Sequence, residues 1–239
     1  MSKKICILYT GKPRVIDHAK SMLELLTGGD NEYHIALTTW VDEDTSEFEL
    51  AFPNSFIDYV QLPKQDDIDR FVANDKYVSM RPLSNYYHQL YIRSKSSETL
   101  KKLNMDFDVV VLIRTDTIIW RNISIFYDDV KSNDDVVFVP IGPNWDIYGT
   151  DVVYGLGACP DVIFFSNQPT MEKILTQQIN ISRETQQRGG VYHPETCQLR
   201  CFQLLNLEVK RLQFDAFIYQ NPNESIGYAS LPPGYNIIR

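Results

Sequence analysis

The sequence predicts an α/β protein with an open, mainly parallel β-sheet that is flanked by helices. The first observation is a short, β-rich apolar run at residues 4–9, followed by apolar residues at helical spacing between Ile16 and Leu26. The second is the run FDVVVLI at residues 107–113, which is continuously apolar and too short for a typical helix. Strands that are covered by helices on both faces have this composition. Strands and helices in this order are typical of an open, mainly parallel sheet.

The first half of the chain supplies further elements of this fold. Strands are expected at residues 33–40 and 57–62. Residues 64–82 are polar and mixed in character, and we expect a loop or lid there. A long helix is expected from about residue 83 to residue 104, and Arg93 falls within the arc of its mostly apolar face, so this face is not purely core.

The second half continues the pattern of short apolar runs and helical segments. Strands are expected at residues 136–140 and 162–165, and helices at about 169–179 and 195–206. Residues 208–219 have the composition of an edge strand. The whole chain is therefore interpreted as one α/β domain, residues 1–239, a length that can bury one sizeable core.

Charge and composition exclude several classes of protein. The 31 acidic and 23 basic residues give a net charge of −8, which disfavours nucleic acid as a partner but leaves room for a nucleotide ligand. No apolar run is long enough to suggest a signal peptide or a membrane span. The four cysteines, Cys6, Cys159, Cys197 and Cys201, lack the spacing of a zinc site. We therefore expect reduced, mostly buried thiols and a cytoplasmic location.

The strongest candidate site is the charged triplet Arg114-Thr115-Asp116, which directly follows the apolar run at 107–113. In open α/β sheets, ligands bind beyond the carboxyl ends of the strands. A carboxylate at that position can hold Mg²⁺ or Mn²⁺, and such a cation stabilises the negative charge that develops on a leaving diphosphate. The alternative interpretation is that Asp116 only caps a turn after a buried strand.

A second candidate is the turn after the first strand, Thr10-Gly11-Lys12-Pro13-Arg14. Gly11 permits a tight turn and a close approach of a ligand to the backbone, while Lys12 and Arg14 offer cations beside a helix start. The turn matches neither the GxGxxG dinucleotide fingerprint nor a P-loop, which argues against ordinary kinase or ATPase chemistry. The alternative is a plain strand–helix turn whose cations are solvated.

Residues 107–120, reading FDVVVLIRTDTIIW, resemble the strand and DxD signature of GT-A glycosyltransferases. The resemblance is closest to poorly characterised families in which the signature reads R-x-D. Those families also open with a strand followed by [ST]-G-x-x-R, here Thr10 to Arg14, and often carry an H-P-E start to a late helix, here His193-Pro194-Glu195. The resemblance spans most of residues 3–219. It implies a GT-A-like fold with a nucleotide-binding, Rossmann-like half.

The resemblance also implies an activity and a donor site. A sugar would be transferred from a nucleoside diphosphate sugar to a glycan or other hydroxyl acceptor. Thr10, Gly11 and Arg14 would hold the nucleotide, and Asp116 would hold Mn²⁺ or Mg²⁺ and the diphosphate. Arg114 replaces the first acid of the full DxD signature and could pair with the diphosphate directly, so metal dependence is open.

His193 is a candidate second metal ligand, because late histidines have this role in some GT-A enzymes. The alternative for His193 is a helix-capping role.

Acceptor-side candidates lie in the Gly- and aromatic-rich stretch at residues 142–151. An inverting transferase needs a carboxylate base near the acceptor hydroxyl, and Asp146 and Asp151 are the candidates by position; a retaining enzyme need not show such a base. Trp145 and Tyr148 could stack on a sugar face, or they could be core aromatics.

Two rival functions stay open. A sugar nucleotidyltransferase on a related fold normally needs a longer Gly-rich loop after the first strand, where only Gly11 is present. A nucleotide- or glycan-binding module that has lost catalysis is the other rival, because Arg114 replaces the first acid of the DxD signature.

Overall fold

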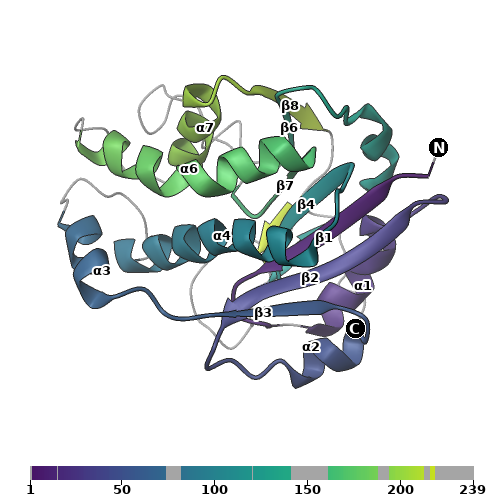
Figure 1. Ribbon diagram of the computed structural model, residues 1–239, viewed down its shortest axis with the longest axis horizontal. Coiled ribbons are helices and arrows are strands. Elements are labelled where there is room, and N and C mark those ends of the chain that lie inside the picture. Colours follow the sequence, from purple (N-terminus) through teal and green to yellow (C-terminus); the bar gives the residue numbers. More distant parts are fainter. Residues whose placement is uncertain are drawn as a thin grey trace, which may run out of the picture.

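A mixed β-sheet forms the centre of the protein (Figure 1). The computed structural model describes residues 2–14, 16–73, 82–119, 121–140, 161–187, 194–212 and 216–218. Within these residues, seven strands pair in the order β3-β2-β1-β4-β7-β6-β8. The predicted fold class, an open and mainly parallel α/β sheet flanked by helices, is confirmed.

The strands on one side of the sheet are all parallel. β1 (Lys4–Thr10) pairs with both β2 (Glu32–Trp40) and β4 (Val109–Arg114), and β3 (Phe56–Val60) pairs with β2 at the edge. Every residue of β4 except Arg114 is buried. The apolar run that predicted this strand is therefore explained by its position between two other strands.

The other side of the sheet contains the antiparallel strand. β7 (Ile163–Ser166) is antiparallel to β4 and to β6 (Val136–Pro140), and β6 is parallel to β8 (Glu208–Leu212) at the far edge. β6 therefore runs in the same direction as β4, and both end at the same edge of the sheet. A short second sheet joins β5 (Thr117–Ile119) to β9 (Ala216–Ile218).

Helices cover both faces of the sheet, because alternate strand residues point to opposite sides. Ile5 and Ile7 of β1 pack with α1 (Ile16–Leu26), α2 (Ser46–Ala51) and the 3₁₀ helix η1 (Ser124–Asp129). Cys6 and Leu8 pack on the other face, with α4 (Leu83–Leu103), α6 (Gln168–Gln187) and α7 (Pro194–Leu204). Figure 1 shows α4 and α6 side by side, away from α1 and α2.

Local sequence signals account for several helix ends. Asn167 caps α6, since its side-chain oxygen accepts a hydrogen bond from the backbone N–H of Thr170 at 2.9 Å. α4 ends at Leu103, and Asn104, which follows it, has a left-handed backbone (φ 50°), a conformation that asparagine tolerates. Pro194 occupies the first position of α7, where its missing N–H costs nothing.

The expected loop at residues 64–82 is wrong for its first part. Residues Gln65–Val72 form α3, because Ile68 and Phe71 lie one turn apart and are buried against α4. The Phe71 ring lies 4.7 Å from that of Tyr87, centroid to centroid. Residues 74–81 of the expected lid lie outside the described residues.

Two elements differ from expectation by more than two residues. The helix expected at 169–179 extends over residues 168–187. The single edge strand expected at 208–219 is instead two elements, β8 at the edge of the main sheet and β9 in the small sheet with β5. α2 was not expected; it is short, and of its residues only Phe48 is buried.

The cysteines that the structure describes are free thiols. Cys6, Cys197 and Cys201 are buried, as expected, and burial raises the pKa of Cys201 to about 12. Cys159 lies outside the described residues. In the described part of the chain, no helix is both long and apolar enough to cross a membrane.

Candidate functional site

The carboxyl ends of β1 and β4 bring the predicted donor-site residues to one edge of the sheet. Thr10 and Arg114 are the last residues of these strands and are partners in the parallel register. Gly11 and Arg14 therefore follow one strand at the same edge where Asp116 follows the other. The sequence placed these residues at two separate turns, and the structure brings the turns together.

Arg114 and Asp116 are paired with each other. Nε and Nη2 of Arg114 donate to Oδ1 and Oδ2 of Asp116 at 2.9 and 2.7 Å. Each side chain is 17% exposed, so the pair is largely shielded but still reached by solvent. A planar guanidinium and a carboxylate in this two-bond geometry form one of the stronger side-chain pairings. Any ligand that uses either group must compete with this pairing.

Further acidic residues act on the same guanidinium. Burial works to lower the pKa of Arg114, but the charge of Asp116 and its hydrogen bonds raise that pKa above its ordinary value. Asp161 and Glu195 shift the pKa in the same direction. Arg114 therefore stays charged at any working pH. Through the charge of Glu195, the start of α7 therefore contributes to the electrostatics of the same site.

Asp161 and Gln89 are two further residues near Arg114 that were not predicted from the sequence. Asp161 is 5% exposed and directly precedes Val162, whose carbonyl accepts a hydrogen bond from the Arg114 backbone N–H at 3.1 Å. Gln89 of α4 donates to Oδ2 of Asp161 at 2.7 Å. An acid immediately before a predicted strand was a visible signal. Its proximity to Arg114 depends on the antiparallel pairing of β7 with β4.

Arg93 is the buried cation beneath this site. It is 1% exposed, and its Nη2 donates to the backbone carbonyl of Asp161. Its Nη1 donates to Oε1 of Gln198 on α7 at 3.3 Å. Burial lowers the pKa of Arg93, and the charge of Asp161 opposes that shift. Arg93 thus joins α4, β7 and α7, which explains a charge on a mostly apolar helix face.

The turn after β1 has the geometry expected of Gly11. Its φ of +103° is a conformation that side-chain-bearing residues rarely adopt, and a Cβ at this position would meet no atom within 4 Å. The Gly11 backbone N–H donates to the carbonyl of Thr38 on β2 at 3.0 Å. The backbone at Gly11 is therefore both fixed and open on the side where a side chain would otherwise stand.

The two cations of this turn differ in their environment. Nζ of Lys12 lies 2.6 Å from a carboxylate oxygen of Glu43, in the loop after β2. Arg14 is exposed, and its guanidinium makes no ion pair or hydrogen bond with the described residues. The Lys12 side chain is still 49% exposed, so it is ion-paired and solvated at the same time. Arg14 is the cation of this turn that a ligand can reach without breaking an ion pair.

Five predicted site residues belong to the segments between β6 and β7 and before α7. Trp145, Tyr148, Asp146, Asp151 and His193 lie outside the described residues. The neighbouring positions can be placed: Pro140 ends β6 and Asp161 precedes β7, so both lie at the same sheet edge as Arg114. His193 immediately precedes α7, whose Glu195 acts on Arg114.

Oxygen donors at this edge suit a hard divalent cation in kind. Asp116 and Asp161 offer carboxylates, which Mg²⁺ and Mn²⁺ prefer. The charges of Asp116 and Asp161 raise the pKa of both Arg93 and Arg114, and the charge of Glu195 raises that of Arg114. Within the described residues, no group of three or more His, Cys, Asp or Glu side chains forms a complete metal site. A cation bound to Asp116 would need further ligands from a substrate, water or residues outside that part.

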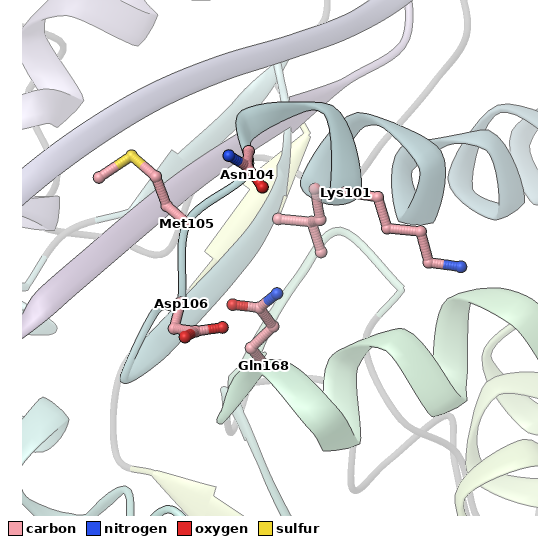
Figure 2. Close-up of a pocket in the computed structure, with 6 residues that line it drawn as sticks. Lys101, Asn104, Met105, Asp106 and Gln168 are labelled. Atoms are coloured by element: carbon pink, nitrogen blue, oxygen red, sulfur yellow. The ribbon is translucent and has the colours of Figure 1, made fainter.

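A cavity of about 280 Å³ lies at the opposite end of β4 (Figure 2). The end of α4, the connection to β4 and the start of α6 line it with Leu100, Lys101, Asn104, Met105, Asp106 and Gln168. The Gln168 amide already accepts from the Phe107 backbone N–H and donates to Glu172, both at 2.8 Å. This cavity is separate from the candidate site and offers no unsatisfied group from Gln168.

Comparison with known proteins identifies the fold. No protein-family model matches the chain, and no curated protein matches it in sequence. Among solved structures, it resembles the crystal structure of an active-site mutant of LgtC, a GT-A glycosyltransferase. The TM-score is 0.51 at 12% sequence identity, over 87% of this chain and 72% of the LgtC chain. The protein therefore has a GT-A-like fold, as the sequence predicted.

Proposed function

We propose that this protein is a glycosyltransferase that moves a sugar from a nucleoside diphosphate sugar to a glycan or other hydroxyl acceptor. The observation that carries the proposal is the Arg114–Asp116 pair at the end of central strand β4, beside the open Gly11 turn. A nucleoside diphosphate needs a surface for its nucleotide and charged groups for its phosphates. The two adjoining turns offer both, on a GT-A-like fold.

On the donor side, the Gly11 turn and Arg14 would bind the nucleotide, and the end of β4 would bind the diphosphate. Arg14 makes no ion pair or hydrogen bond with the part of the chain that the structure describes, and Gly11 lets the ligand approach the backbone. Arg114 would turn from Asp116 to the phosphate oxygens, which match its planar donors. Asp116 and His193 would hold Mn²⁺ or Mg²⁺, which would supply Lewis acidity toward the leaving diphosphate.

On the acceptor side, the segment between β6 and β7 would supply the base and the sugar-binding surface. Both flanks of the segment lie at the site edge, at Pro140 and Asp161. Asp146 or Asp151 would accept the proton of the attacking hydroxyl in an inverting reaction.

The free, buried thiols of Cys6, Cys197 and Cys201 support a reducing compartment such as the cytoplasm.

One observation favours a second candidate, a nucleotide- or glycan-binding module without catalysis. Arg114 and Asp116 neutralise each other, which is an arrangement that also suits a purely structural pair. A module of this kind would bind nucleoside diphosphates or glycans without consuming a nucleotide sugar.

A panel of nucleotide sugars tests the proposal directly. Melting temperature is measured with UDP-, GDP-, ADP- and CDP-sugars, with and without Mn²⁺, because a ligand that binds the folded state raises it. Stabilised pairs are then assayed for release of nucleoside diphosphate, with Asp116→Asn as the inactive control. A rise in melting temperature together with release of nucleoside diphosphate supports the transferase. A rise in melting temperature without such release, whichever acceptor is added, supports the binding module. No shift with any nucleotide sugar contradicts the transferase and a nucleotide-binding module.

A further inference from the structure

The middle residue of the R-x-D triplet connects the two turns of the candidate site. Thr115 is 3% exposed, and its hydroxyl donates to the backbone carbonyl of Lys12, in the turn after β1. The same carbonyl accepts the backbone N–H of Arg14 at 2.8 Å. The Lys12 carbonyl is therefore the point where the turn after β4 contacts the turn after β1.

This contact lies beyond the end of strand pairing. The register between β1 and β4 ends at Thr10 and Arg114. In the part of the chain that the structure describes, the Thr115 hydroxyl makes the one hydrogen bond that joins residues 11–14 to residues 115–116. The side chains on either side of Thr115 point to each other in the Arg114–Asp116 pair, whereas Thr115 is buried toward the other turn.

We propose that Thr115 is a positioning residue that sets the separation between the Gly11–Arg14 turn and the Arg114–Asp116 pair. This inference rests on the proposed function, in which one nucleoside diphosphate contacts both turns. A ligand with two anchoring points gains from both only when their spacing matches its own length. The Thr115 hydroxyl therefore selects for a ligand that spans both turns, and does little for one that contacts a single turn.

The chain offers a matched control two residues away. Thr117 is 2% exposed, and its hydroxyl donates to the Val162 carbonyl at 3.3 Å, on β7 rather than on the turn after β1. Thr115→Val and Thr117→Val each remove one buried hydroxyl with little change in shape. Thr115→Ser restores the hydroxyl.

The test compares ligands that contact one turn or both. Dissociation constants of UDP, GDP and ADP, and of inorganic pyrophosphate as the single-turn ligand, are measured by calorimetry. For the nucleoside diphosphate that the wild-type protein binds, Thr115→Val should weaken binding about five- to tenfold, the loss expected for one hydrogen bond. Thr117→Val and Thr115→Ser should stay within about twofold, and pyrophosphate affinity should change little in all variants.

Two results would overturn the proposal. One is wild-type nucleoside diphosphate affinity in Thr115→Val, and the other is an equal loss in Thr117→Val, which would mark a general effect of a lost buried hydroxyl. If the wild-type protein binds none of the nucleotides, the proposed function fails by itself. Amide hydrogen exchange over residues 11–14 then tests the positioning: faster exchange in Thr115→Val than in Thr117→Val supports it, and equal exchange contradicts it.

Discussion

The Arg114 guanidinium donates two hydrogen bonds to the carboxylate of Asp116, so the basic and acidic groups of this turn are already paired. The sequence suggested two separate roles for them, a phosphate ligand and a metal ligand. Their pairing makes those roles interdependent, because each group becomes available only when the other is released or shared. It also gives Asp116 a partner, so this residue is more than a free acid at a strand end.

The first prediction concerns the strength of this pair. Asp116→Asn removes the charge opposite a shielded guanidinium and should lower the free energy of unfolding by about 1–3 kcal/mol. Arg114→Gln should have a similar cost, and the double variant should cost less than the two single changes combined. Urea unfolding of all four proteins measures the coupling. Strictly additive losses would show that the pair does not form in solution.

The second prediction concerns metal and nucleotide. A diphosphate that draws Arg114 away leaves Asp116 free for a cation, so each ligand should tighten the binding of the other. We expect the affinity for Mn²⁺, measured by calorimetry, to rise about tenfold or more in the presence of a nucleoside diphosphate. The nucleoside diphosphate used is that of the nucleotide sugar that stabilises the protein in the panel. Arg114→Gln should bind Mn²⁺ alone more tightly than the wild type does, with weaker coupling.

Removal of metal with EDTA shows whether a cation takes part in nucleotide binding. If EDTA leaves nucleoside diphosphate affinity unchanged, Arg114 neutralises the phosphates without a metal. In that case, Arg114→Lys should weaken nucleotide binding, because lysine cannot reproduce the planar pair of donors.

Sequence patterns predicted the sheet well, because burial on both faces makes a strand continuously apolar. Residues 107–113 gave β4 and the end of that strand gave the position of Arg114. The α3 helix was missed because only two of its residues, Ile68 and Phe71, are buried, among mostly polar ones. Asp161 and Gln89 were missed as site residues for a different reason. Asp161 lies near Arg114 only through the antiparallel pairing of β7 with β4, which local sequence does not determine.

The third prediction concerns Arg93. This buried guanidinium holds the Asp161 backbone and Gln198, so Arg93→Met should leave both acceptors unsatisfied. We expect a loss of about 2–4 kcal/mol in the free energy of unfolding, measured in urea. Arg200→Met on the exposed side of α7 is the control and should change stability by less than about 0.5 kcal/mol. Equal effects of the two changes would contradict a structural role for Arg93.

The last prediction concerns the acceptor side and the segment at residues 142–151. Its glycines permit bending, Trp145 offers a flat face for a sugar ring, and Asp146 offers a base. The described residues on either side of it, Pro140 and Asp161, lie at the edge that carries Arg114, which is where the acceptor would meet the donor in the proposed reaction. Trp145→Ala should therefore raise the acceptor KM several-fold while donor affinity stays constant. Asp146→Asn keeps the size of the side chain but removes its basicity, and it should lower kcat with little change in either affinity. Full activity in Asp146→Asn would move the role to Asp151 or indicate a retaining reaction without such a base. Loss of donor binding in Trp145→Ala would place this segment on the nucleotide side of the site.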